Sequence, residues 1–240
     1  MEIEVKLAPV SSETGALILE NEPFYIEETR KIKMDALYFD TPCRELKKQG
    51  ISLRLRRENS QSVCCLKIRR SDIARQEFEV EADTIADGIK KLCTLPDLPA
   101  EAKALVQSSE LVCLFESHYT RLCRLARIDH AVIEIACDRG KLCQGDRSCG
   151  ISEVELELKE GKEEDLQAMC RYLQAKYALP LSLSTKAGRA SALSEEAFDA
   201  LPVFDVSELT RELGEELFYS GRLWCKTEGD KITCRRSEKY

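Results

Sequence analysis

Charged and apolar residues alternate strictly at the start of this chain and again past its middle. The opening residues MEIEVKL carry a charge at every second position, and residues 153–159, which read EVELELK, repeat the pattern. Successive side chains of a β-strand point to opposite faces, so each segment would present one charged face and one apolar face. Strands of this kind gather both signs of charge on one face of a sheet, which strongly constrains the fold.

Period-two alternation predicts eight strands, and apolar residues at helical spacing predict six helices. The expected strands span residues 1–7, 35–39, 51–57, 62–69, 75–82, 117–128, 131–138 and 151–159. The expected helices span residues 11–21, 84–93, 99–108, 162–177, 186–199 and 206–219. Eight mainly antiparallel strands would close into a barrel, because closure removes exposed edges. We therefore expect an α+β protein built on an eight-stranded antiparallel β-barrel.

The amphipathic helices decide which face of the barrel points inward. They need an apolar surface to pack on, so the apolar face of the sheet should lie outside, covered by helices. The charged face then lines the interior, which becomes a polar tunnel. We assign residues 1–199 to the tunnel domain and residues 200–240, around and after Pro202, to a helix-plus-hairpin appendage.

A tunnel with so many charges needs external partners. Unpaired buried charges are costly, and mutual pairing alone would give no reason for the number of them. Carboxylates suit Mg²⁺ or Mn²⁺, and Arg and Lys side chains suit phosphate oxygens. The joint pattern therefore predicts a site for a metal–polyphosphate complex, although any single strand could equally present a solvated face.

Composition excludes several other classes of site. The net charge of −7 and the pI near 5.2 argue against a general nucleic-acid or membrane surface. We expect a cytoplasmic protein, because the strand that starts at residue 2 leaves no room for a signal peptide. The 12 cysteines form no CxxC pair and there are two histidines, so we expect free thiols and no zinc site. Whether Cys225 and Cys234 pair across the expected C-terminal hairpin stays open.

A series of motifs over residues 1–195 resembles, in order, those of the CYTH or triphosphate tunnel metalloenzyme superfamily. The opening residues 2–6, EIEVK, are similar to the ExExK signature of that superfamily. The other motifs are Tyr38–Pro42, Leu53–Arg56, Leu66–Lys67, Glu77, Arg121, Ile133–Ile135 and Glu153–Leu158, and Ser184–Arg189 resembles the closing Ser-Lys motif with one inserted residue. The YFDTP and EVELEL segments look most like the bacterial inorganic triphosphatase branch.

The resemblance implies a tunnel that binds a triphosphate together with Mg²⁺ or Mn²⁺. By position, the metal carboxylates would be Glu2, Glu4, Glu153 and Glu155, helped by Asp138 and Glu157. The phosphate-binding cations would be Lys6, Arg54, Arg56, Lys67, Arg121 and Lys186, with Glu77 and Glu134 lining the tunnel and orienting a cation or a water. Lys6, Glu4 and Glu155 would be the catalytic residues, with Lys6 in its charged form.

We therefore predict a divalent-metal-dependent triphosphatase that acts on inorganic tripolyphosphate, with ATP and thiamine triphosphate as further candidate substrates. A class IV-type adenylate cyclase or a thiamine triphosphatase would share the tunnel. A non-enzymatic polyphosphate- or nucleotide-binding protein is the remaining alternative, although complete metal carboxylates argue against it. The choice between Mg²⁺ and Mn²⁺, the role of residues 200–240 and the oligomeric state, for which a homodimer is one candidate, stay open.

Overall fold

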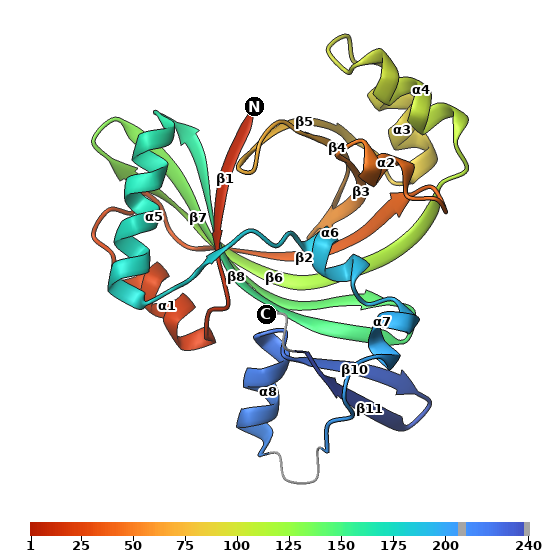
Figure 1. Cartoon of the computed structure of the whole chain (residues 1–240). Helices are drawn as coiled ribbons and strands as arrows, with labels where there is room; N and C mark the ends of the chain where they lie inside the picture. Colours follow the sequence, from red (N-terminus) through yellow and green to blue (C-terminus); the bar gives the residue numbers. More distant parts are fainter. Residues whose placement is uncertain (206–209, 238–240) are drawn as a thin grey trace.

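The computed structural model describes residues 1–205 and 210–237, apart from the side chains of Ser191 and Glu195. Eight antiparallel strands follow one another in the order β8-β7-β6-β2-β3-β4-β5-β1, and β1 pairs back with β8, which closes the barrel (Figure 1). Their bounds are β1 Glu2–Leu7, β2 Arg30–Asp40, β3 Ile51–Glu58, β4 Gln61–Arg69, β5 Ala74–Glu81, β6 Val112–Ile128, β7 Ala131–Gln144 and β8 Arg147–Glu160. The predicted barrel is confirmed, and β2, β6, β7 and β8 are longer than we predicted.

The helices follow the predicted pattern with two differences. Their bounds are α1 Ser12–Asn21, α2 Glu45–Lys48, α3 Ile85–Thr94, α4 Ala100–Ser108, α5 Glu163–Tyr177, α6 Lys186–Ser191, α7 Glu195–Asp199 and α8 Arg211–Tyr219. The helix predicted over 186–199 is two short helices, because Ser194 caps a new helix by accepting a hydrogen bond from the Ala197 amide. The single turn α2 is too short to show periodicity. Residues 206–209, the predicted start of the last helix, lie outside the described residues.

Helices cover the outer face of the barrel on two sides. Helices α1 and α5 pack on β1, β7 and β8 around Leu7, Leu156 and Leu173. Helices α3 and α4, at the upper right of Figure 1, complete a second cluster on β3, β4 and β5 around Leu66 and Leu92. Full burial of each such side chain stabilises the fold by about 1.5–3 kcal/mol. The apolar outer face under helices is therefore confirmed on these two sides.

A third apolar cluster lies on the inner face of the sheet. Met34 and Tyr38, which lie on one face of β2 and also line the interior cavity, pack here with Leu193 between α6 and α7, Phe198 of α7 and Trp224. Beyond the charged layer the inner faces of β6, β7 and β8 continue as apolar surface. We had placed the apolar face of the sheet wholly outside. Helices α6 and α7 cover this inner apolar surface and close one end of the barrel.

The C-terminal hairpin extends the barrel sheet. Its strands β10 (Leu223–Glu228) and β11 (Lys231–Arg236) add to β8, and the two-residue β9 (Leu181–Ser182) adds to β1. Helix α8 rests on β8 at Gly150, where an added Cβ would lie 2.3 Å from the Phe218 carbonyl oxygen. Cys225 and Cys234 face each other across the hairpin as free thiols with their Sγ atoms 3.5 Å apart.

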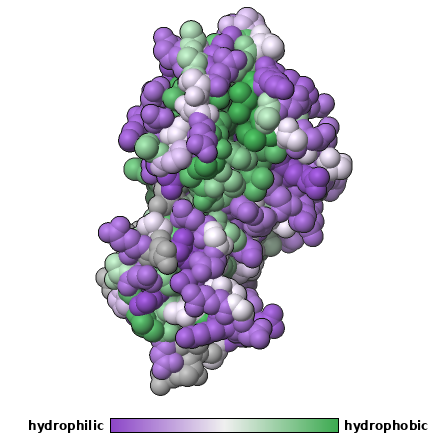
Figure 2. Space-filling model, turned by 90° about the vertical axis from the view of Figure 1, so that its right-hand side faces the viewer, coloured by the Kyte–Doolittle hydropathy of each residue, from purple (hydrophilic) through white to green (hydrophobic). Residues whose placement is uncertain are grey.

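The surface differs between the two halves of the molecule. Figure 2 shows the side on which α3 and α4 form the top, and apolar side chains gather there over the middle of the upper body. The lower part, which holds the C-terminal elements, is mostly polar in the same view. Among the described residues, no helix combines the length and the apolar character needed to cross a membrane.

Candidate active site

The barrel encloses a cavity of about 330 Å³ whose wall is mostly charged. Twelve of the side chains that we predicted for the site line it: Glu2, Glu4, Lys6, Arg54, Arg56, Lys67, Glu77, Arg121, Glu134, Glu155, Glu157 and Lys186. The other two, Asp138 and Glu153, lie behind the wall with exposed fractions of 1% and 0%. The interior therefore brings the predicted constellation together, but in two layers.

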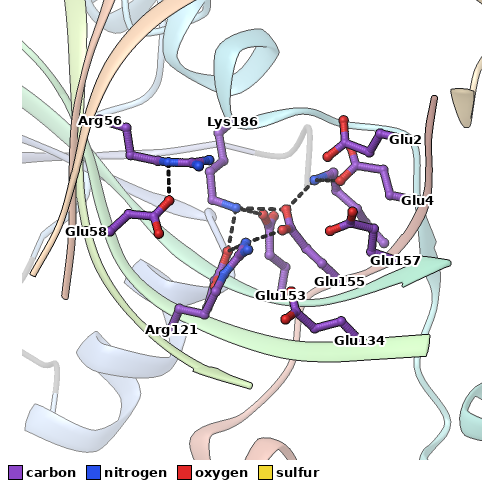
Figure 3. Close-up of polar contacts among 12 residues, drawn as sticks. Glu2, Glu4, Arg56, Glu58, Arg121, Glu134, Glu153, Glu155, Glu157 and Lys186 are labelled. Atoms are coloured by element: carbon purple, nitrogen blue, oxygen red, sulfur yellow. Dashed lines mark hydrogen bonds and ion pairs between the residues drawn. The ribbon is translucent and has the colours of Figure 1, made fainter. Parts of the chain in front are cut away.

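Lys186 reaches into the deeper layer from the start of α6. Its Nζ donates to Asp138 Oδ2 at 2.7 Å, to Glu155 Oε1 at 2.9 Å and to Glu153 (Figure 3). The oxygens of these three carboxylates lie within 4.8 Å of one another. We had predicted the three acids as metal ligands and Lys186 as a phosphate-binding cation. In the structure the ammonium group instead occupies the space between the carboxylates. We call Lys186 and these three carboxylates the Lys186 cage.

Three further cations surround the Lys186 cage. Arg121 binds Asp138 through two hydrogen bonds of 2.8 Å and also contacts Glu155. Lys6 contacts Glu155, and Arg189 of α6 contacts Glu153. Every carboxylate of the cage therefore has at least two cationic partners.

The surrounding charges favour the ionised forms of Glu155 and Lys6. Burial opposes the charged form of Glu155, but Lys186, Lys6 and Arg121 outweigh it and hold the pKa of Glu155 well below its ordinary value. Burial also opposes the charged form of Lys6, yet Glu155 and Glu4 raise its pKa above the ordinary value of a lysine. These contacts favour the charged form of Lys6.

Three carboxylates line up across β1, β8 and β7 beside the Lys186 cage. Glu157 of β8 lies directly opposite Glu4 of β1 on one side and Glu134 of β7 on the other. Like charges in such positions destabilise a sheet unless a cation lies between them. We call Glu4, Glu157 and Glu134 the acidic row, and Glu2 lies beside it in Figure 3.

The acidic row, like the Lys186 cage, has four cationic neighbours. Lys159 lies 2.8 Å from Glu157, Arg30 lies 2.6 Å from Glu134, and Arg75 and Lys6 lie 3.3 and 3.4 Å from Glu4. Burial, with Glu2 and Glu134 adding to it, outweighs Lys159 and raises the pKa of Glu157. Hard carboxylate oxygens that face a cavity fit Mg²⁺ or Mn²⁺.

The cations of β3 and β4 face the cavity from another side, and Arg54 is the least neutralised of them. Its nearest carboxylate, Glu77, is 3.8 Å away, and its buried Nε has no hydrogen-bond partner among the described residues. Arg56 is paired with Glu79 at 3.0 Å, and Lys67 binds Glu2 at 2.6 Å. An unpaired buried N–H group is costly, so Arg54 is suited to an incoming anion.

Residues 1–191 match the family model of the CYTH domain. The chain belongs to the CYTH domain family. It is 29% identical over 206 residues to a protein of Haemophilus influenzae named inorganic triphosphatase. The matched region covers 82% of this chain and 56% of that relative. The chain thus spans about half the length of this curated relative.

Solved structures share the CYTH tunnel. A putative adenylyl cyclase from Hippeastrum, described as having a dominant triphosphatase activity, superposes with a TM-score of 0.53 and 21% identity over 80% of this chain and 96% of that chain. The PH1819 protein of Pyrococcus horikoshii OT3 gives a TM-score of 0.51 and 16% identity over 78% and 97%. At these identities the likeness confirms the fold alone.

Two cations of the CYTH tunnel escaped our prediction. Arg75 of β5 lies 3.3 Å from Glu4 and directly opposite Glu2. Arg30 belongs to β2, which begins five residues before our predicted strand. Both residues lie on the inward-facing side of their strands, at alternating positions that extend toward the strand starts. The alternation at the strand ends could therefore have identified them.

The ionised Glu77 carboxylate contributes to the stability of the tunnel, and this contribution is lost at acid pH. Burial opposes its charge, but Lys67, a hydrogen bond from Cys65 and Arg54 together lower its pKa from 4.5 to about 2. The stabilisation is therefore complete above pH 4.5 and is lost as the pH falls through about 2. We expect the free energy of unfolding of the wild type to exceed that of Glu77→Gln by roughly 2–3 kcal/mol near neutral pH.

This difference is measured by urea unfolding of both proteins between pH 2 and 7. Glu101→Gln, on the exposed part of α4, controls for the loss of a negative charge. A difference between wild type and Glu77→Gln that stays constant down to pH 2 would show that Glu77 is not held ionised by Lys67 and Arg54.

Proposed function

We propose that this CYTH tunnel is a divalent-metal-dependent triphosphatase that hydrolyses inorganic tripolyphosphate. The observation that carries the proposal is the pairing of two walls in one cavity. The acidic row presents carboxylate oxygens to the cavity on one wall, and Arg54 offers a buried unpaired N–H group on another. A metal–polyphosphate complex has groups that match both walls. The Haemophilus influenzae relative named inorganic triphosphatase favours the same reaction.

Mg²⁺ or Mn²⁺ would be held by Glu4 and Glu157, with Glu2 and Glu134 beside them. Bound there, the ion would neutralise phosphate charge and make a water molecule a better nucleophile. Arg54, Arg56 and Lys67 would bind the phosphate oxygens, with the planar Arg side chains able to form two parallel hydrogen bonds.

Lys6 stands between the two acidic groups and would stabilise the charge that develops in the transition state. Its ammonium group is preorganised by Glu155 and stays charged, so it needs no reorganisation during the reaction. Such positioning and charge neutralisation supply most of the catalysis in phosphoryl transfer. Glu155, Asp138 and Glu153 then act as positioning residues, which hold Lys6, Arg121 and Lys186.

The reaction is tested by phosphate release from tripolyphosphate, ATP and thiamine triphosphate with Mg²⁺ or Mn²⁺, with EDTA as the control. We expect rapid hydrolysis of tripolyphosphate that EDTA abolishes. Formation of pyrophosphate and cyclic AMP from ATP would instead identify a cyclase. Binding of tripolyphosphate without turnover of any substrate would identify a non-enzymatic binding protein.

One observation favours organic triphosphates as second substrates. A cavity of about 460 Å³ adjoins the tunnel and shares Tyr38, Ser52 and Thr185 with it. Phe115, stacked on Tyr38 with ring centroids 4.3 Å apart, and the exposed Leu183 contribute apolar surface to this outer cavity. The wall of this outer cavity combines such apolar surface with charged side chains such as Arg44 and Lys47, and cavities of this size with apolar surface and a few placed polar groups are typical of sites for small organic ligands. Thiamine triphosphate or ATP would place its organic group there.

Arg54 provides a direct test of phosphate binding. Replacing Arg54 with Gln removes a charged hydrogen-bond donor worth about 1.5–3 kcal/mol, so tripolyphosphate should bind roughly 10- to 100-fold more weakly. Orthophosphate, which can use the other cations, should lose much less affinity. Both affinities are measured by calorimetry with EDTA present, so that tripolyphosphate is not hydrolysed during the titration.

Arg57→Gln serves as the matched control for this titration, since Arg57 follows on the same strand but is exposed and does not line the cavity. Its affinity for tripolyphosphate should equal that of the wild type. Equal losses for tripolyphosphate and orthophosphate in Arg54→Gln would rule out an extended phosphate chain along this wall.

A further inference from the structure

The helix that carries Lys186 cannot keep its position by itself. Helix α6 has six residues, and helices this short are not stable without tertiary packing. The ion pairs that Lys186 and Arg189 make with buried carboxylates add little net stability, because removing the charges from water costs about as much as their attraction contributes. The position of Lys186 therefore depends on what packs against α6 and the residues that follow it.

Apolar contacts join the end of α6 to the C-terminal hairpin, β10–β11. Ala190 and Leu193 are 0% exposed and belong to the inner apolar cluster, together with Phe198 of α7 and Trp224 of β10. The Trp224 indole is 2% exposed, and its Nε1 donates a hydrogen bond of 3.0 Å to the Gly221 carbonyl oxygen, which fixes the orientation of the ring. The hairpin thus provides part of the surface on which α6 and α7 pack.

Hydrogen bonds also tie the segment after α7 to β11. The Arg235 guanidinium donates to the Leu201 carbonyl oxygen at 2.9 Å and lies over the Phe198 ring, 5.6 Å from its centroid. The Phe204 amide donates to the Cys234 carbonyl oxygen at 2.9 Å. The chain that leaves the Lys186 helix is therefore fixed to the hairpin by both apolar and polar contacts.

Every hairpin residue in these contacts lies beyond the CYTH match, which ends with α6 at residue 191. We propose that the C-terminal hairpin positions Lys186 in the tunnel, with Trp224 and Arg235 as positioning residues. Lys186 lines the cavity, so a loosened hairpin would let its ammonium group leave the cage and change the wall that meets the substrate. The catalytic part of this inference rests on the proposed function, whereas the position of Lys186 can be measured without turnover.

Acetylation of lysine side chains with acetic anhydride, followed by mass spectrometry, measures this position. In the wild type, Lys186 is 7% exposed and bound to three carboxylates, so it should react slowly. Arg235→Met keeps an aliphatic side chain but loses a charged donor, so Lys186 should react roughly 10-fold faster. Lys6 also contacts Glu155 but is carried by β1, so its rate should not change.

Turnover separates positioning from packing. When the Lys186 helix is less often in place, KM for tripolyphosphate should rise while kcat stays unchanged, because saturating substrate draws the helix back. Arg235→Lys, which restores a charged donor, should recover both the slow acetylation and the wild-type KM. Arg236→Met is the matched control, since Arg236 is the exposed neighbour on the same strand, and it should behave as the wild type.

Unchanged acetylation of Lys186 in a folded Arg235→Met would overturn the inference, and so would an equal acceleration at Lys6, which would show general opening of the barrel. Faster acetylation with an unchanged KM would limit the hairpin to packing and overturn its role in the reaction. If Arg235→Met does not fold, Trp224→Phe, which retains an aromatic ring but not the Nε1 donor, should give the same selective increase. A wild type that does not hydrolyse tripolyphosphate would overturn the proposed function, while the acetylation rates would still decide whether the hairpin holds Lys186.

Discussion

Replacing Glu4 with Gln should reduce tripolyphosphate hydrolysis at least about 100-fold, because it removes a central metal ligand of the proposed site. Glutamine has the size of glutamate but no charge, so the row of Glu4, Glu157 and Glu134 would lose part of its attraction for a divalent ion. The measurement is the rate of phosphate release at saturating Mg²⁺. Circular dichroism should show an intact barrel, because Glu4 is only partly buried and its cationic contacts, Arg75 and Lys6, lie 3.3 and 3.4 Å away.

Glu81→Gln is the matched control for Glu4→Gln. Glu81 carries the same charge on β5 but is exposed and does not line the cavity, so its turnover should equal that of the wild type. A folded Glu4→Gln that keeps full metal-dependent activity would show that the acidic row does not hold the ion.

Replacing Arg121 with Met should destabilise the fold by about 3 kcal/mol, because the Asp138 carboxylate would lose its two-hydrogen-bond partner. The Asp138 side chain is 0% exposed, so water cannot replace the guanidinium. For a chain of this size the loss corresponds to a fall of roughly 6–12 °C in Tm. Thermal unfolding of both proteins at neutral pH measures it.

A double variant separates the cost of an unpaired buried charge from the cost of lost packing. Arg121→Met combined with Asp138→Leu removes both charges and should be more stable than Arg121→Met alone. Lys91→Met, which breaks the exposed pair with Asp87 on α3, should leave Tm unchanged. A double variant that is less stable than the single one would show that Asp138 keeps enough partners without Arg121.

The strands and the cavity wall could be predicted because alternate residues of a β-strand lie on opposite faces of the sheet. Once Glu4 and Lys6 are assigned to a strand, their common face follows, and the helices then decide that this face is the inner one. The same rule does not say how far each strand continues. For this reason Arg30, at the early start of β2, and the apolar inner surface under Leu193 lay beyond the prediction.

The position of Lys186 could not be predicted in the same way. Its place near an opening of the tunnel follows from the motif, but its partners depend on the direction of α6. That direction is determined by packing of Ala190 and Leu193 against the inner apolar cluster, which involves residues more than 150 positions apart. The local sequence pattern carries no information on such a contact. The sequence therefore could not show whether a metal ion or the Lys186 ammonium lies between Asp138, Glu153 and Glu155.

The chain has one tryptophan, Trp224, and it is 2% exposed between the C-terminal hairpin and the α6–α7 end of the barrel. The family match ends at residue 191, yet this indole, from well beyond that limit, packs with the helix that carries Lys186. Its fluorescence therefore reports from inside the protein on any shift of α6 when substrate or metal enters. The indole is therefore an internal probe at the junction between the CYTH match and the C-terminal hairpin.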